Sequence, residues 1–220
     1  MKTIPRCLFT LITVLSLSFF SALTSAGKFN SIISIGDTLP AFDNLSGVDG
    51  GKHSSKNIEE DILVLVSLSN TCPFSNGIEK DLINLVNELK NESVKFIGVN
   101  YNMNKLDNLN AMQERKKHYH YNFSYLKDSE QTLGRQLGTT VTPEFFVFNK
   151  DRKLIYTGLL HNSPAMSQGG KSVYLKGNPT EFYVRNAIFA ATKNKTLTIE
   201  ETRPYGCSVE YSSALESAQH

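Results

Sequence analysis

The chain has 220 residues, of which 40% are hydrophobic, 20% charged and 10% aromatic, and this composition is ordinary for a globular protein. It excludes a disordered chain, a collagen-like repeat and a small disulfide-rich scaffold. Lys and Arg number 23 against 21 Asp and Glu, and the formal charge of +2 is too small to indicate nucleic acid as a partner.

The N-terminus has the pattern of a secretory signal peptide. Lys2 and Arg6 form a basic start, residues 8–20 are almost all apolar or hydroxyl-bearing, and small residues at Thr24 and Ala26 precede the expected cut. The apolar stretch is shorter than the roughly 20 residues that span a bilayer, and an uncleaved membrane anchor is the alternative. We therefore expect an exported protein, periplasmic or secreted, and favour the periplasm.

Cleavage after Ala26 would remove Cys7 and leave two cysteines, Cys72 and Cys207. An exported protein meets an oxidising compartment, where two such thiols can pair or work as a redox couple. No second long apolar segment follows, so we expect no membrane contact after signal cleavage.

The segments that follow alternate between strand and helix patterns. A Gly-, Asp- and Asn-rich stretch over 30–57 predicts an N-terminal extension with short hairpin strands. The apolar, β-branched run 62–68 predicts a strand that is buried on both faces. Apolar residues at helical spacing then predict an amphipathic helix after Cys72; they are Ile78, Leu82, Leu85, Val86 and Leu89.

The second half of the chain predicts further elements in a similar alternation. In chain order we expect a strand at 94–99, a polar inserted helix at 105–118, a short helix capped by Ser129 and ending at Gly138, a buried strand at 145–148, a turn at 149–152 into a strand at 153–157, a loop at 164–178 and a last helix at 179–192. This order predicts an α/β layered fold with helices on both faces of the sheet.

Cys72-Pro73-Phe74-Ser75 lies where the buried strand passes into the first helix. A thiol in the first turn of a helix is close to the positive end of the helix dipole, which favours the thiolate. Pro73 suits this turn because it has no N–H to leave unpaired. Ser75 stands where a second cysteine would close a local disulfide, so the site is monothiol, and an inert buried cysteine is the alternative.

Val141-Thr142-Pro143 directly precedes a predicted strand. Because proline inside a strand would cost a ladder hydrogen bond, the Thr142-Pro143 bond is a candidate for the cis form.

These segments together resemble a known family. The strand–Cys72-Pro73-Phe74-Ser75–helix unit, the Thr142-Pro143 strand and the 149–152 hairpin look like the thioredoxin fold, and residues 35–42 resemble the start of redoxin and AhpC/TSA domains. Residues 201–209 resemble the tail of a peroxiredoxin-like subfamily that has a Gly-Cys pair after its last helix. The likeness covers residues 34–211 and implies a thioredoxin-like three-layer sandwich, with a central mixed sheet, helices on both faces and an N-terminal hairpin extension.

The resemblance divides the chain and implies roles for its residues. The expected parts are the signal peptide at 1–26, an extension of the redoxin domain at 27–60, the thioredoxin-like core at 61–195 and the tail at 196–220. Cys72 matches the attacking cysteine, Cys207 the tail cysteine that resolves, and Thr142-Pro143 the pair that faces the sulfur and docks extended substrates.

The chain departs from peroxiredoxins at several positions. Their Pro-x-x-x-Thr-x-x-Cys pattern is Leu65, Ser69 and Cys72 here, so Ser69 can replace the threonine hydroxyl but Leu65 cannot mimic the proline. Glu144 follows Pro143 where no peroxiredoxin-like arginine is evident. The possible substitutes are Arg135 and Arg152.

The resemblance implies a thiol oxidoreductase whose Cys72 attacks a peroxide or a disulfide, after which Cys207 forms a Cys72–Cys207 disulfide that a reductant protein reopens. Three alternatives stay open. The first is a monothiol disulfide-exchange enzyme of the glutaredoxin or isomerase type. The second is a non-catalytic module that binds an extended peptide. The third is a Cys72–Cys207 disulfide that never opens.

Other polar segments indicate no further chemistry. His118 and His120 have the spacing to share a metal on a strand, but no third ligand is evident, and we predict neither a metal nor a cofactor. The run Arg115-Lys116-Lys117 is interpreted as a solvated helix end.

Overall fold

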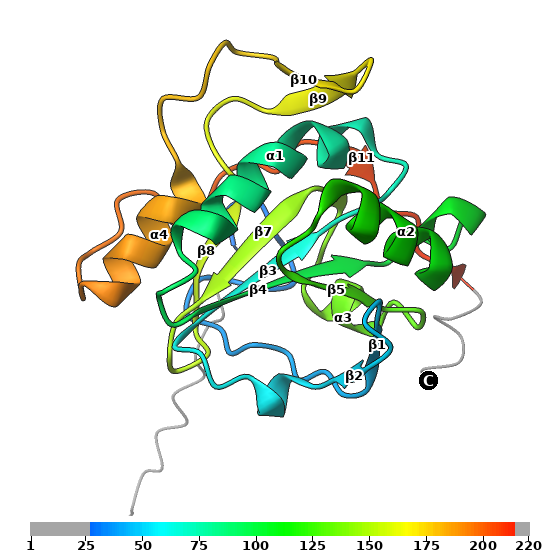
Figure 1. The fold of residues 1–220 in the computed structure, drawn as a ribbon. Coiled ribbons are helices and arrows are strands. Elements are labelled where there is room, and N and C mark those ends of the chain that lie inside the picture. The colour runs from blue at the N-terminus through cyan, green and yellow to red at the C-terminus, as the bar shows by residue number, and fades with distance from the viewer. Residues whose placement is uncertain (1–26, 214–220) are drawn as a thin grey trace, which may run out of the picture.

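The computed structural model describes residues 27–213, and the predicted signal peptide, its cleavage site and Cys7 lie outside them (Figure 1). At the centre is a seven-stranded mixed sheet with the strand order β2-β1-β5-β4-β3-β7-β8. Its strands are β1 (Leu45–Gly47), β2 (Lys52–His53), β3 (Ile62–Ser67), β4 (Val94–Asn100), β5 (Ser124–Lys127), β7 (Glu144–Phe148) and β8 (Leu154–Gly158). The helices are α1 (Pro73–Glu88), α2 (Leu109–Tyr119), α3 (Thr132–Gln136) and α4 (Tyr183–Thr192), with short 3-10 turns at Ser55–Asn57 and Lys105–Asp107.

The central strand β3 divides the core into two layers. It pairs with β4 in parallel and with β7 antiparallel, and every one of its residues is buried. Val64 and Val66 pack with α1 and α4 on one face, whereas Leu63 and Leu65 pack with α3 and the N-terminal extension on the other. Helices therefore cover both faces, as predicted, and the architecture is a thioredoxin-like α/β sandwich (Figure 1).

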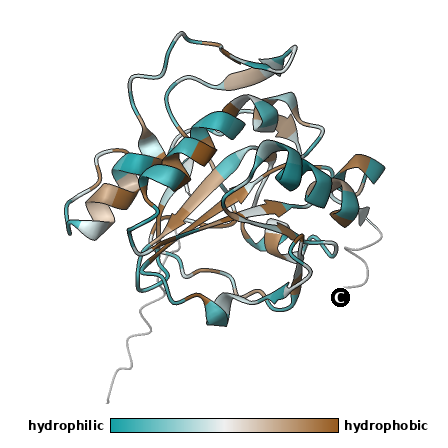
Figure 2. Ribbon diagram, in the orientation of Figure 1, coloured by the Kyte–Doolittle hydropathy of each residue, from teal (hydrophilic) through white to brown (hydrophobic). Residues whose placement is uncertain are grey.

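Residue polarity follows these layers. Figure 2 shows hydrophobic residues along the central strands and hydrophilic ones over much of α2. Met112 is the buried residue of α2, which explains the weak amphipathic pattern of this segment.

The structure differs from the sequence predictions at three places. The expected loop at 164–178 contains a hairpin of β9 (Ala165–Gln168) and β10 (Lys171–Tyr174), which lies over α1 (Figure 1). Strand β5 was not expected at all. Ser129 does not cap α3, because Asp128 accepts the N–H groups of Thr132 and Gly134 instead.

The chain after α4 returns across the molecule toward the start of α1. The Thr157 N–H donates to Glu200 and the Thr202 N–H donates to Thr157, so this segment runs beside the edge strand β8. It then forms β11 (Cys207–Ser208), which pairs antiparallel with β6 (Val141–Thr142) in a separate two-stranded sheet. Over residues 27–213, no helix has the length and apolar character that crossing a bilayer requires.

Candidate active site

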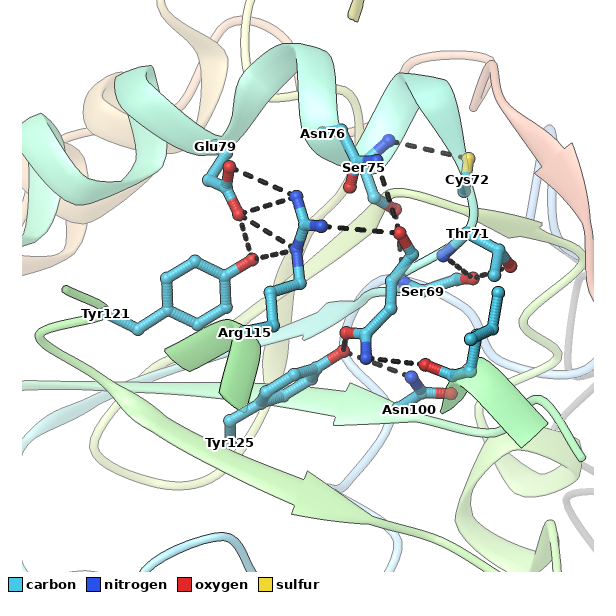
Figure 3. Close-up of polar contacts among 12 residues, drawn as sticks. Ser69, Thr71, Cys72, Ser75, Asn76, Glu79, Asn100, Arg115, Tyr121 and Tyr125 are labelled. Atoms are coloured by element: carbon cyan, nitrogen blue, oxygen red, sulfur yellow. Dashed lines mark hydrogen bonds and ion pairs between the residues drawn. The ribbon is translucent and has the colours of Figure 1, made fainter. Parts of the chain in front are cut away.

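Cys72 is the N-cap of α1, with Pro73 in the first turn, as the sequence predicted. The sulfur accepts the Ser75 N–H at 3.4 Å, a contact that Figure 3 draws, and the thiol donates to the Thr142 carbonyl at 3.0 Å. The side chain is only 2% exposed. The backbone of Thr142, seventy residues along the chain, therefore holds the sulfur at the end of α1.

The Thr142-Pro143 peptide bond is cis, which confirms the prediction for this pair. Ser67 at the end of β3 fixes the turn, because its hydroxyl donates to Val141 and accepts the Glu144 N–H, both at 2.8 Å. This role of Ser67 was not predicted from the sequence. The backbone of residues 141–143, called the proline ledge below, therefore lies directly beside the Cys72 sulfur.

The tail places Cys207 on this same ledge. Cys207 lies opposite Thr142 in the β11–β6 pair, and the Val209 N–H extends the ladder to Thr140 at 2.9 Å. Both cysteines are free thiols. The structure thus brings together Cys72, Thr142, Pro143 and Cys207, four of the predicted site residues.

The two thiols differ in how readily they ionise. Burial alone would raise the pKa of Cys72, but hydrogen bonds with the Cys207 thiol, with Thr142 and with backbone N–H groups outweigh it, and the pKa falls below the ordinary value of 9.0. Burial, together with the adjacent Cys72 thiolate, raises the pKa of Cys207 to about 12. Cys72 is therefore the more acidic thiol of the pair, and Cys207 is the one that keeps its proton to higher pH.

The residue before the tail cysteine, Gly206, lies in close contact with the backbone of Thr142. A Cβ at this position would overlap the carbonyl oxygen of Thr142, so any other residue would push β11 away from β6. One residue earlier, the Tyr205 ring packs edge-on against Phe74, with 5.2 Å between the ring centroids. The tail contacts the Cys72 turn and the proline ledge at the same time.

A cavity of about 540 Å³ adjoins the two cysteines. Its wall combines residues of the Cys72 loop, of the segment after β4 and of the tail: Ser69, Thr71, Cys72, Asn102, Met103, Asn104, Cys207, Ser208, Glu210, Tyr211 and Ser212. Met103 is more than half exposed at its mouth. Both cysteines thus border the same cavity, where a small ligand would lie beside them.

The loop before Cys72 is fixed by Asp107, a residue that sequence analysis did not single out. This carboxylate is fully buried and accepts the hydroxyls of Ser69 and Thr71 at 3.1 and 3.0 Å. It also accepts the Asn70 N–H at 2.6 Å. The Ser69 hydroxyl additionally lies 3.0 Å from Thr71 Oγ1 (Figure 3), so it is engaged within its own loop. Ser75 Oγ accepts the Ser69 N–H at 3.2 Å and ties this loop to α1.

The two arginines named as possible substitutes are engaged elsewhere. Arg135 donates to the Ser212 carbonyl and Arg152 to the Ile58 carbonyl, and neither lines the cavity beside Cys72. Leu65 lies fully buried in the middle of β3, opposite Ile97 and Phe146. A proline there would interrupt the central ladder.

Arg115 corrects the interpretation of 115–117 as a solvated helix end. It pairs with the buried Glu79 of α1 at 3.0 Å and, with Tyr121, forms the cluster on the left of Figure 3. Lys116 is also partly buried and donates to the Phe123 carbonyl. Only Lys117 of the three is fully exposed. Arg115 extends to the Asn70 carbonyl at 3.4 Å and so supports the Cys72 loop indirectly.

Glu144 is buried, whereas the histidine pair that the sequence offered as metal ligands is exposed. Glu144 is 2% exposed, and burial raises its pKa to about 8 although the Thr140 and Val141 N–H groups oppose the shift. His118 and His120 are exposed at the end of α2 and not on a strand. Within residues 27–213, no group of three His, Cys, Asp or Glu side chains has the arrangement to hold a metal.

Comparisons with known proteins agree with this architecture. Residues 35–157 match the AhpC/TSA family. An uncharacterised conserved protein from Geobacillus kaustophilus is similar in structure, with 24% identity, a TM-score of 0.74, and 84% of this chain and 95% of that chain covered.

A hypothetical protein from Sinorhizobium meliloti has 23% identity and a TM-score of 0.73, with 82% of this chain and 96% of that chain covered. A putative thioredoxin from Neisseria meningitidis has 19% identity and a TM-score of 0.55, with 72% and 92% covered. These likenesses establish the fold. No curated protein matches the chain.

Proposed function

The chain belongs to the AhpC/TSA family, and from that premise we propose that it is an exported thiol oxidoreductase in which Cys72 and Cys207 alternate between two thiols and one disulfide. The observation that carries the proposal is the position of Cys207, which lies opposite Thr142 in the β11–β6 pair while the Thr142 carbonyl lies 3.0 Å from the Cys72 sulfur. Export is proposed from the N-terminal pattern, because an oxidising compartment is where such a pair would be cycled.

Thiol–disulfide exchange is the reaction that the contacts support best. The Cys72 thiolate attacks one sulfur of a substrate disulfide, forms a mixed disulfide and expels the other sulfur as a thiolate. Cys207 then loses its proton and attacks the Cys72 sulfur, which forms the Cys72–Cys207 disulfide and releases the second substrate thiolate. The substrate gains the two electrons that the protein pair loses, and a dithiol partner protein reopens the disulfide by the reverse exchanges.

The pKa difference assigns the order of these steps. Cys72 has the lower pKa of the two thiols, so it ionises more readily and attacks first. The Cys72 charge is among the causes that raise the pKa of Cys207, and formation of the mixed disulfide removes that charge. The Cys207 thiol therefore becomes easier to deprotonate when its attack is due.

Peroxide reduction is the second candidate, and the family match favours it. The thiolate would attack one peroxide oxygen, become a sulfenic acid and release the other oxygen as an alcohol or water; Cys207 would then form the disulfide and release water. Two features weigh against it as the main reaction. The Ser69 hydroxyl is bound to Asp107, and no arginine among residues 27–213 lines the cavity beside Cys72.

Peptide mapping by mass spectrometry under non-reducing conditions tests the proposal. The protein is treated with oxidised glutathione or with hydrogen peroxide, and the Cys72–Cys207 peptide is quantified over time. We expect glutathione disulfide to give this cross-link, and the Cys207→Ser protein to accumulate glutathione on Cys72. Two free thiols after both treatments would overturn the dithiol cycle.

Three measurements separate the remaining alternatives. Faster cross-linking with peroxide than with glutathione disulfide would select the peroxidase. A reduction potential below about −300 mV would indicate a disulfide that stays closed for structural reasons. A Cys72 that is alkylated no faster than an ordinary thiol would select the peptide-binding module.

A further inference from the structure

The tail of this chain is itself an extended, cysteine-bearing segment that is bound at the Cys72 site. Residues 207–208 pair with β6, and the Val209 N–H continues the ladder to Thr140. Cys207 lies opposite Thr142, and the carbonyl of Thr142 lies 3.0 Å from the Cys72 sulfur. The tail therefore shows how an extended polypeptide can place a cysteine sulfur against Cys72.

The tail also blocks the approach of any other protein along this ledge. Cys72 is 2% exposed, and the β6 edge is already hydrogen-bonded to β11. Beyond Cys207 the tail is held again by two hydrogen bonds. The Tyr211 hydroxyl donates to the Thr139 carbonyl at 2.8 Å, and the Ser212 N–H donates to the Gln131 side-chain oxygen at 2.8 Å. A disulfide carried on a protein segment must displace β11 to reach the sulfur.

Two contacts of the tail are selective for side-chain size. The Thr142 carbonyl leaves no space for a Cβ on the residue before the cysteine, which in the tail is Gly206. The Phe74 ring contacts an aromatic ring on the residue before that glycine, which in the tail is Tyr205. A competing segment that binds in the same register meets the same two surfaces.

We propose that the tail is an internal mimic of the substrate, and that the preferred substrates are disulfides on extended segments with the order aromatic–Gly–Cys. This inference rests on the proposed function and adds to it the class of partner. The segment adds a strand to β6 in place of β11, and its main-chain hydrogen bonds provide affinity while the two side-chain positions provide selectivity. Return of the tail to β6 brings Cys207 back to Cys72, so formation of the Cys72–Cys207 disulfide and release of the partner are coupled.

The experiment uses the Cys207→Ser protein and synthetic peptides. The first peptide copies residues 203–209, Arg-Pro-Tyr-Gly-Cys-Ser-Val, with its cysteine as a mixed disulfide with nitrothiobenzoate. Attack by Cys72 on the peptide sulfur forms the Cys72–peptide disulfide and expels coloured nitrothiobenzoate, which gives the rate. Two further peptides carry Ala in place of Gly and Ala in place of Tyr, and mass spectrometry identifies the adduct on Cys72.

We expect the Gly peptide to react about tenfold faster than its Ala counterpart, a difference that one steric clash readily produces. Loss of the tyrosine ring should slow the reaction roughly threefold to tenfold, as expected for an aromatic pair. In the protein, Tyr205→Ala should speed the reaction of the Gly peptide because the competing tail is held less firmly. Phe189→Ala removes an exposed ring on α4, away from the site, and serves as the matched control, with no expected change.

The outcomes separate the two proposals. Equal rates for the Gly and Ala peptides, with adducts on Cys72, would overturn the inference and leave the dithiol cycle intact. If the rate depends on Gly and Tyr in the peptide but does not change in the Tyr205→Ala protein, the peptide does not compete with the tail. No adduct on Cys72 with any peptide would overturn the proposed function itself.

Discussion

The Ser69 hydroxyl donates a hydrogen bond to the Asp107 carboxylate, with 3.1 Å between the two oxygens. Through this contact, and through those with Asn70 and Thr71, one buried carboxylate fixes the loop that leads into Cys72. No cationic group is among its hydrogen-bond partners in the described part of the chain; neutral donors satisfy its charge. The geometry of the sulfur depends on a residue thirty-five positions further along the chain.

Asp107→Ala should lower the free energy of unfolding by about 3 kcal/mol or more, because several buried donors lose a charged acceptor. Urea denaturation measures this loss. The freed loop should also change the rate at which iodoacetamide alkylates Cys72 in the folded protein. Asp151→Ala, in the exposed turn before β8, is the control and should leave both measurements unchanged. A stable variant with unaltered alkylation would show that Asp107 does not position the loop.

Cys207→Ala should raise the pKa of Cys72. The Cys207 thiol is the foremost of the hydrogen-bond donors that lower this pKa, and alanine cannot replace it. The pH dependence of Cys72 alkylation gives the midpoint for each protein. Cys207→Ser restores a donor and should give a smaller rise. A midpoint that stays where it was, or falls, would contradict the hydrogen bond between the two sulfurs.

Gly206→Ala should slow formation of the Cys72–Cys207 disulfide, because the added Cβ overlaps the Thr142 carbonyl and moves β11 off β6. The core lies elsewhere, so the free energy of unfolding should change little. The cross-link is measured by non-reducing peptide mapping after treatment with glutathione disulfide. Ser208→Ala changes an exposed neighbour in the same strand and should cross-link at the original rate. Equal rates for the two variants would argue against the close approach of Gly206.

Glu144 should make the protein less stable as the pH rises from about 4.5 to about 8. Burial raises its folded pKa to about 8, above the ordinary 4.5, so the folded state binds a proton that the unfolded state has lost in this interval. The stabilisation is complete below pH 4.5 and lost as the pH passes 8, with a slope of at most about 1.4 kcal/mol per pH unit. Urea unfolding across this range measures the slope. Glu144→Gln should flatten it, and a slope that persists in this variant would assign it to other groups.

Arg115→Met should destabilise the protein by about 3–5 kcal/mol, the usual cost when one partner of a buried ion pair is removed. Glu79 would keep its buried carboxylate, whose pKa burial already raises, without the guanidinium. Thermal or urea unfolding measures the loss. Lys117→Met, on the exposed side of the same helix, should change the stability by less than about 0.5 kcal/mol. Similar losses for both variants would show that the ion pair is not what stabilises this region.

The sequence predicted the parts of the fold that depend on local patterns. The β-branched run before Cys72 is the central strand, the apolar spacing after it is α1, and the proline before the later strand is cis. Each of these features has a signature within a few residues, so chain-distant contacts were not needed to recognise it. The role of Cys207 came from the family resemblance and from no local pattern.

The remaining features depend on contacts that no local pattern records. Strand β5 is short and polar in part, and only its pairing with β1 and β4 makes it a strand. The β9–β10 hairpin leaves β10 mostly exposed, so no alternation of apolar residues marks it. Asp107 sits in a short polar turn, and its role becomes visible only when the Cys72 loop folds against it. Arg115 resembled a solvated residue because its partner Glu79 lies on another helix.

Because the tail runs along β8 before it reaches Cys72, one segment both covers the edge of the sheet and carries Cys207. Residues 200–202 cover the outer edge of the sheet before the chain reaches the site. Proteolysis between α4 and this segment would remove the second thiol and, in the same event, uncover a strand whose unpaired amides attract other strands. A cleaved molecule would therefore lack Cys207 and would also tend to associate with other copies through the exposed edge of β8. Self-association would then indicate loss of the Cys72–Cys207 pair.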